Sequence, residues 1–163
     1  MKSKLPVRRV MPIEKLFGED LEDTRLLQAM AADAEKFLES FEWCKAIEEK
    51  YCSAGIGGVV AIFFFGIDPK RPQVVEWLWV VVGDLPSAYL VTDNCESPSK
   101  ALEAYIWNMR RWSRLAKPGK ASPDVIPVNV PATPKWAKEL EGRLNFLEQH
   151  ILPQFRDDEV QRA

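Results

Sequence analysis

Hydrophobic residues concentrate in the middle of the chain, where they do not alternate with polar residues. One run extends from Val59 to Ile67, and a second, from Val74 to Val82, follows after a short proline-containing loop. A loop this short favours an antiparallel hairpin over a crossover connection. The turn Gly83-Asp84-Leu85-Pro86 then leads to a third, shorter strand. We predict a three-stranded antiparallel meander over about 58–67, 73–83 and 87–92.

The second of these strands predicts a sheet that is covered on both faces. Leu78 and Val80 fall on one face, while Trp77 and Trp79 fall on the other. A sheet with one wet face would alternate polar with apolar residues. Burying roughly 150–250 Å² of each tryptophan at ~25 cal/mol per Å² contributes at most about 4–6 kcal/mol. We therefore expect the second face to be covered by helices of this chain or by a second copy, in a homodimer.

Apolar residues at three- and four-residue steps predict helices before and after the meander. The first such stripe begins near Leu21 and extends to Tyr51, which predicts one long helix or a helix pair over about 21–52. A capping side chain followed by proline marks two further helix starts, at Ser97-Pro98 and Thr133-Pro134. These starts predict helices over about 98–116 and 134–152, packed on the sheet. The predicted fold class is α+β.

The predicted elements form one domain over 19–155. Residues 1–18 hold two prolines and little periodicity, so we expect an extended N-terminal arm, and we expect residues 156–163 to fray. The connector 117–134 holds five prolines. A connector this long is often functional or covers a sheet edge.

The amino-acid composition limits which class of protein this chain can belong to. Charged residues at 28% and hydrophobic residues at 47% are typical of a soluble globular protein. The longest apolar run is too short to span a bilayer, and the basic N-terminus lacks the apolar core of a secretory signal. Three cysteines without close pair spacing indicate a reducing compartment. We expect a cytoplasmic protein with no membrane partner.

Charge is spread unevenly along the chain. Residues 19–51 carry ten acidic and four basic side chains. An acidic helix face here is a candidate docking surface for a basic partner, represented by Glu35, Glu39 and Glu42, with an ordinary solvated face as the alternative.

A second candidate surface follows from the helix predicted over 98–116. Trp107, Arg110, Arg111 and Arg114 lie off its apolar stripe. Tryptophan and arginine are enriched at protein interfaces, and they also stack on nucleic-acid bases, which we consider the less favoured partner. The alternative is a tryptophan half-covered by a neighbouring segment, with arginines favoured by the dipole near the helix C-terminus.

We predict no catalytic residues, no cofactor site and no metal site. His150 is the only histidine, and Cys44, Cys52 and Cys95 lack the close pair spacing of zinc ligands. The glycines at 55–58 precede a strand, whereas a phosphate loop joins a strand to a helix N-terminus.

The Gly83-Asp84-Leu85-Pro86 turn and the later helix stretch Ala101-Leu102-Glu103-Ala104-Tyr105-Ile106 are similar to a pattern in small uncharacterised bacterial proteins. This resemblance covers roughly residues 40–116 and implies no activity and no site residues. The size and the sheet-plus-helix plan also resemble bacterial toxin-immunity proteins, which implies an inhibitor that binds a basic toxin.

The leading prediction is a non-catalytic protein-binding module, with an immunity-like or antitoxin-like inhibitor as the form that the resemblance implies. The alternative is a small-molecule-binding domain or an enzyme. Its pocket would lie between the sheet and the connector 117–134.

Overall fold

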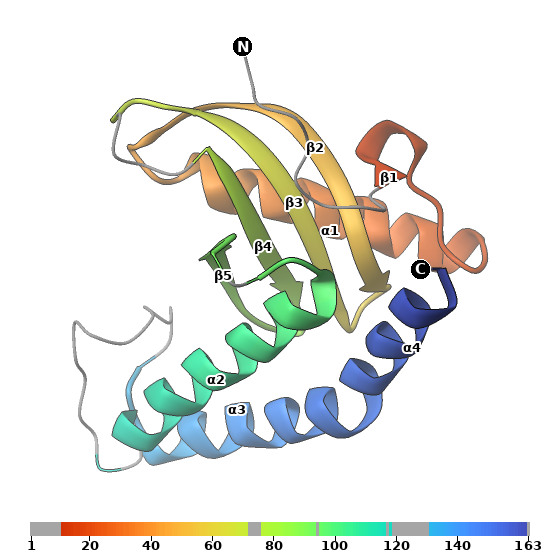
Figure 1. Ribbon diagram of the computed structural model, residues 1–163. Coiled ribbons are helices and arrows are strands. Elements are labelled where there is room, and N and C mark those ends of the chain that lie inside the picture. The colour runs from red at the N-terminus through yellow and green to blue at the C-terminus, as the bar shows by residue number, and fades with distance from the viewer. Residues whose placement is uncertain (1–10, 72–75, 94, 117, 119–130, 163) are drawn as a thin grey trace. The chain divides into compact units, whose positions relative to one another are not determined.

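The computed structural model describes residues 11–71, 76–93, 95–116, 118 and 131–162 (Figure 1). The fold is α+β, as predicted. The chain forms two compact units, Met1–Ala101 (unit 1) and Leu102–Ala163 (unit 2). The boundary falls inside helix α2, Pro98–Ala116. The single domain over 19–155 and the packing of the two later helices on the sheet stay predictions.

Unit 1 is built on a five-stranded antiparallel sheet with the strand order β1-β2-β3-β4-β5. Its strands are β1 Met11–Pro12, β2 Cys44–Ile56, β3 Val60–Pro69, β4 Trp77–Gly83 and β5 Leu85–Val91. A 3-10 turn, η1 Ile13–Lys15, follows β1, and helix α1, Leu21–Glu39, lies along one face of the sheet (Figure 1). The predicted meander is confirmed as β3, β4 and β5. The structure adds β1 and β2, which the sequence did not indicate.

Strand β2 corrects the prediction of helix over 40–52. Helix α1 begins after Asp20, whose side chain accepts a 2.8 Å hydrogen bond from the Asp23 amide, and it ends at Glu39. The pairing of β2 with β3 then shifts register at three points. Each bulge adds a residue, so Cys44 and Ile47 lie three positions apart yet both pack against the core under α1. A spacing of three is also the spacing of a helix, and this explains the error.

The first face of the sheet packs against α1. Residues of α1 at helical spacing are buried there, namely Leu27, Met30, Ala31, Ala34 and Leu38. They share a core cluster with alternate residues of the two central strands, namely Ala61, Phe63, Phe65, Ile67, Leu78, Val80 and Val82. A helix places every third or fourth residue on one face and a strand places every second residue on one face, so these two sets of residues meet in a single core.

The second face of the sheet is also buried. Trp77 is 5% exposed and Trp79 is completely buried. The ring of Phe64 stacks on Trp77, with 4.9 Å between centroids, and lies 4.6 Å from the centroid of Trp79. The Trp79 indole Nε1 donates a 3.0 Å hydrogen bond to the Cys95 carbonyl. The prediction that these tryptophans are shielded from water is confirmed, while the homodimer stays a prediction.

Unit 2 contains most of α2 and a long helical stretch made of α3 Pro134–Phe146, the π-helical turn η2 Leu147–Ile151 and α4 Leu152–Arg162. The predicted helix over 98–116 is confirmed, and the second helix begins at Pro134 after the N-cap Thr133, as predicted. Helices α2 and α3 lie side by side (Figure 1), and the buried hydroxyl of Ser113 donates a 3.0 Å hydrogen bond to the Ala137 carbonyl.

The last helix does not end near Pro153, and the residues expected to fray are helical as far as Arg162. Proline has no amide hydrogen, and its ring clashes with the carbonyl four residues earlier in a regular helix. The π turn just before Pro153 interrupts that regular pattern, because the Leu152 amide bonds to the Leu147 carbonyl, five residues back. Such a turn explains how the helix passes the proline.

Candidate functional site

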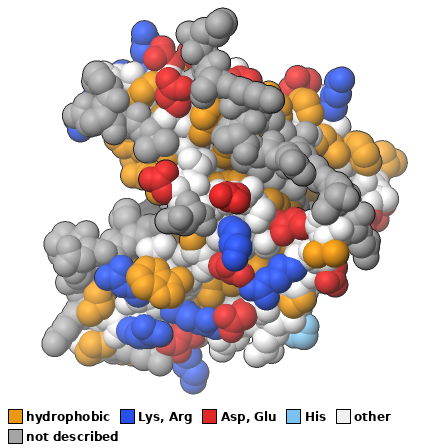
Figure 2. Space-filling view, viewed as in Figure 1, with side chains coloured by type: hydrophobic (Ala, Val, Ile, Leu, Met, Phe, Trp, Pro, Cys, Tyr) orange, Lys and Arg blue, Asp and Glu red, His pale blue; other side chains and the backbone are white. Residues whose placement is uncertain are grey.

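A surface groove runs between α2 and the η2–α4 segment of unit 2. It encloses about 430 Å³. Its lining combines apolar and charged side chains: Glu103, Ile106, Trp107, Arg110, Arg114, Glu148, Leu152 and Arg156. Over α2 and the helix after it, Figure 2 shows Lys and Arg side chains next to Asp and Glu side chains and beside hydrophobic ones. The groove is therefore a mixed surface with an aromatic residue in its wall.

Trp107 is the most exposed aromatic side chain in this wall, with 59% of its surface in solvent. Arg111 lies one helical turn further along α2, and its guanidinium carbon is 4.9 Å from the centroid of the indole. This distance is within the range of a cation–π interaction. Arg114 is exposed one turn beyond Arg111. Helical spacing thus aligns one aromatic ring and two cations, which we call the Trp107 surface (Trp107, Arg111 and Arg114).

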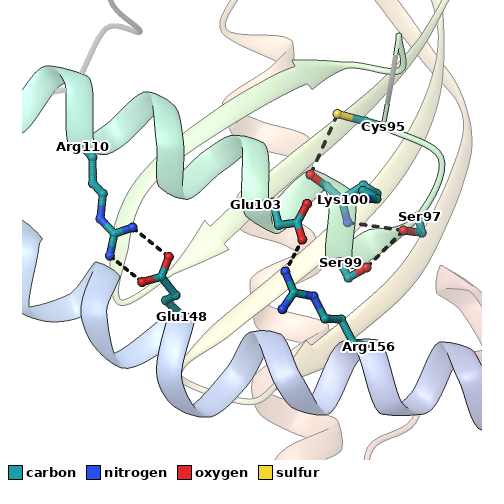
Figure 3. A network of polar contacts seen from close by, with 8 residues as sticks. All are labelled: Cys95, Ser97, Ser99, Lys100, Glu103, Arg110, Glu148 and Arg156. Atoms are coloured by element: carbon teal, nitrogen blue, oxygen red, sulfur yellow. Dashed lines mark hydrogen bonds and ion pairs between the residues drawn. The ribbon is translucent and has the colours of Figure 1, made fainter.

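Arg110 is held by Asn145 of α3 and by Glu148 of η2, and Figure 3 shows its guanidinium pointing toward Glu148. Its guanidinium donates to both carboxylate oxygens of Glu148, at 2.8 and 3.0 Å, and to Asn145 Oδ1 at 3.0 Å. The hydrogen bonds from Arg110 lower the pKa of Glu148 and raise that of Arg110. A forked pair of this kind fixes geometry well, although both groups are too exposed for it to add much stability.

A second ion pair joins Arg156 of α4 to Glu103 of α2 (Figure 3). The two glutamates that line the groove are therefore each bound to an arginine. No acidic partner holds Arg111 or Arg114 among the residues that the structure describes. The Trp107 surface consequently carries two positive charges that no neighbouring carboxylate neutralises.

The structure places the seven candidate residues of the two predicted surfaces in different settings. Of the four on α2, Trp107, Arg110 and Arg114 line the groove and Arg111 lies against Trp107. Sequence reasoning missed the partners of the arginines, because the contacts of Arg110 and Arg156 bridge 38 and 53 residues of chain. The π turn that contains Glu148 also has no clear sequence signal apart from Pro153.

The three acidic candidates do not form one helix face. Glu35 forms an ion pair with Lys50 of β2, and its side chain is only 24% exposed. Glu39 is exposed in the last turn of α1, whereas Glu42 lies in the turn that follows the helix. Two of the three therefore remain on the open surface, and they flank Phe41.

Between and beside these two glutamates lies a half-buried aromatic cluster (Phe37, Phe41, Trp43 and Tyr89). The ring centroids of Phe41, Trp43 and Tyr89 are each 5.1 Å from the other two. Phe37 meets Phe41 edge-on at 5.3 Å. The sequence did not reveal this cluster, because strand β5 supplies Tyr89 from a distant part of the chain.

Side chains that could ligate a metal ion are not gathered in the described part of the chain. No three His, Cys, Asp or Glu side chains come together there in a way that would hold a metal ion. The three cysteines are buried, and none forms a disulfide bond among the described residues. Burial raises the pKa of Cys52 to about 12, so its thiol is a poor source of the nucleophilic thiolate.

Two polar groups of the described residues are buried without a hydrogen-bond partner, the Ser53 hydroxyl and the Trp77 indole Nε1.

None of the helices that the structure describes combines the length and the apolar character needed to cross a membrane. Comparison of the chain with protein-family models, curated proteins and solved structures gave no match. The functional argument therefore depends on the geometry of the chain itself.

Proposed function

We propose that this protein is a non-catalytic protein-binding module that contacts its partner through the Trp107 surface. The observation that carries the proposal is a tryptophan that is 59% exposed beside two arginines that have no acidic partner among the described residues. Tryptophan and arginine are the residue types that most often dominate the binding energy of protein interfaces.

The exposed area of Trp107 is large enough to matter for binding. A tryptophan contributes roughly 150–250 Å² when it is buried, so the exposed fraction of Trp107 corresponds to roughly 90–150 Å². At ~25 cal/mol per Å², a partner that covered it would gain about 2–4 kcal/mol. Ile106 and Leu152, which line the adjoining groove, are almost completely buried, so the Trp107 ring supplies the apolar area that this surface exposes.

The charged groups of the groove suit binding better than proton transfer. A general base works best with a pKa close to the working pH. Arg110 instead lowers the pKa of Glu148, and Glu103 is held by Arg156. Both carboxylates thus act as fixed partners of arginines, which holds the walls of the groove in place.

A toxin-inhibiting role is a second candidate function, which would use a different surface, and one observation favours it. The aromatic cluster of unit 1 lies beside the exposed Glu39 and Glu42. Aromatic residues with acids next to them suit a basic partner, which the acids would attract over a distance. The alternative pocket between the sheet and the connector 117–134 falls largely outside the described residues and stays a prediction.

The proposal is tested by site-specific photo-cross-linking in the native cells. The photoreactive residue p-benzoylphenylalanine replaces Trp107 in one variant and Phe146 in another. Phe146 is 47% exposed and is not part of the groove, so it is a matched control. We expect a defined cross-linked protein from position 107 and none of the same size from position 146. No cross-linked protein from position 107, or the same product from both positions, would contradict the proposal.

A further inference from the structure

We propose that the partner segment on the Trp107 surface is acidic, with carboxylates that pair with Arg111 and Arg114 and an apolar side chain that covers the Trp107 indole. This inference rests on the proposed function and names the chemistry of the partner. It starts from the charges of the described residues around the ring.

The first step is the charge that the surface leaves without a partner. Glu148 binds Arg110 through two hydrogen bonds, and Glu103 binds Arg156. These pairs use the two carboxylates of the groove lining. Arg111 and Arg114 keep their positive charges, so complementary charge on a partner must be negative. A basic segment would face two guanidinium groups and would be repelled.

The second step separates an acidic peptide from a nucleic acid. A nucleic acid presents a continuous line of phosphates and binds best along an uninterrupted basic track. Here Glu103 and Glu148 lie in the same groove, with side chains 33% and 48% exposed. Because these carboxylates are paired with Arg110 and Arg156, the described residues around Trp107 leave Arg111 and Arg114 as the cations without an acidic partner, which is a short basic track for a strand that follows the groove. A peptide suits such a surface better because it places carboxylates at a few chosen positions.

The third step is the spacing along α2. At about 1.5 Å per helical residue, Arg111 lies about 6 Å and Arg114 about 10 Å from Trp107 along the helix axis. An extended peptide advances about 3.3 Å per residue. Side chains of an extended peptide alternate between its two faces, so carboxylates two and four residues from an apolar side chain lie on the same face as that side chain, about 7 and 13 Å away. These distances match the two arginines to within the reach of their side chains, and the simplest matching pattern is Leu-Ser-Glu-Ser-Glu, read along the helix from Trp107.

The inference is tested with two short synthetic peptides that share every residue except the charged pair. One carries Leu-Ser-Glu-Ser-Glu and the other carries Leu-Ser-Lys-Ser-Lys. Binding to the ¹⁵N-labelled full chain is followed by NMR through the Trp107 indole signal, which is assigned by its absence in Trp107→Phe. Inorganic phosphate and a short single-stranded oligonucleotide are titrated separately.

We expect the Glu peptide to shift the Trp107 indole signal and the Lys peptide to leave it in place. Raising the salt from about 50 mM to about 500 mM should weaken binding of the Glu peptide several-fold, because the contacts are exposed charges. A shift with the Lys peptide as large as with the Glu peptide would overturn the inference. So would no shift with the Glu peptide, or tighter binding of the oligonucleotide or of phosphate.

Charge reversal supplies the matched protein variants. R111E/R114E should abolish the effect of the Glu peptide, whereas K135E/K138E, which changes the net charge equally on exposed residues of α3, should keep it. The same two variants are then tested for cross-linking from position 107. If R111E/R114E still cross-links to the same protein, the acidic partner is wrong while the binding module stands. If position 107 captures nothing in the parent protein, the proposed function itself fails.

Discussion

The sheet of unit 1 and helix α2 of unit 2 place tryptophan in opposite environments. Trp79 of β4 is completely buried, lies against Phe64, and donates its indole hydrogen to the Cys95 carbonyl at 3.0 Å. Trp107 of α2 is 59% exposed and has an arginine over its ring. Both are large aromatic residues in regular elements, yet one has its contacts within the chain and the other leaves most of its ring in water.

The difference separates a role in folding from a role in binding. The burial and the hydrogen bond of Trp79 contribute to the free energy of unfolding, because both are lost when the chain unfolds. The exposed ring area of Trp107 contributes little to stability and is free to be covered by a partner. The aromatic cluster of unit 1 lies between these two cases, since its rings pack on one another and are only half-buried.

The largest expected effect comes from truncating the two tryptophans in parallel. Trp79→Ala removes a buried ring and should lower the free energy of unfolding by about 3–5 kcal/mol. Trp107→Ala leaves an exposed helix position with a good helix former and should change it by less than about 0.5 kcal/mol. Urea unfolding followed by circular dichroism measures both. Equal losses of stability would contradict the assignment of Trp107 to binding.

The next effect concerns two tryptophans of the same strand face. Trp79 has a partner for its indole hydrogen, whereas the Trp77 Nε1 is buried without one among the described residues. Each is replaced by phenylalanine, which keeps an aromatic ring and removes the donor. Trp79→Phe removes the hydrogen bond to the Cys95 carbonyl, so it should cost about 1–2 kcal/mol more than Trp77→Phe. Urea unfolding followed by circular dichroism measures both losses in the free energy of unfolding. Equal losses would show that the Trp79 hydrogen bond makes no net contribution to stability.

These positions also show how far the sequence determines the fold. The unbroken apolar pattern around Trp77 and Trp79 was enough to predict the meander and its two buried faces. Local capping signals at Ser97-Pro98 and Thr133-Pro134 were enough to place two helix starts. Both signals, the apolar runs and the cap followed by proline, involve residues that are neighbours in the sequence, and each is compatible with one kind of structure.

The errors occurred where a pattern had two meanings or depended on distant residues. The bulges of β2 spaced its buried residues like those of a helix, so the strand was predicted as helix. The π turn allowed the last helix to pass Pro153. At the candidate site, the sequence indicated Trp107 and the arginines. It could not indicate that Arg110 binds Glu148, because that contact depends on how two helices pack.

The smallest expected effect is the pH dependence of the exposed ion pair between Arg110 and Glu148, which contrasts with the buried hydrogen bond of Trp79. Hydrogen bonds from Arg110 lower the pKa of Glu148 in the folded protein below its ordinary value of about 4.3. The ionised carboxylate therefore stabilises the folded state. This contribution is fully present above the ordinary pKa and is lost as the pH falls through the lower, folded value.

Glu148→Gln should thus lower the free energy of unfolding near neutral pH by only about 0.2–1 kcal/mol, since solvent screens the pair. The difference from the parent protein should shrink as the pH falls below the ordinary pKa of Glu148 and through its lower folded value, because the carboxylate then becomes protonated in the parent as well. Urea unfolding over a series of acidic and neutral pH values measures it, and the same substitution in an Arg110→Ala background is the control. In that background the dependence on pH should be much smaller, because the main group that lowers the pKa of Glu148 is gone and only the weaker effect of the Arg156 charge remains. A dependence as large without Arg110 as with it would show that another group holds the carboxylate, and that the groove wall at η2 is fixed by something other than this pair.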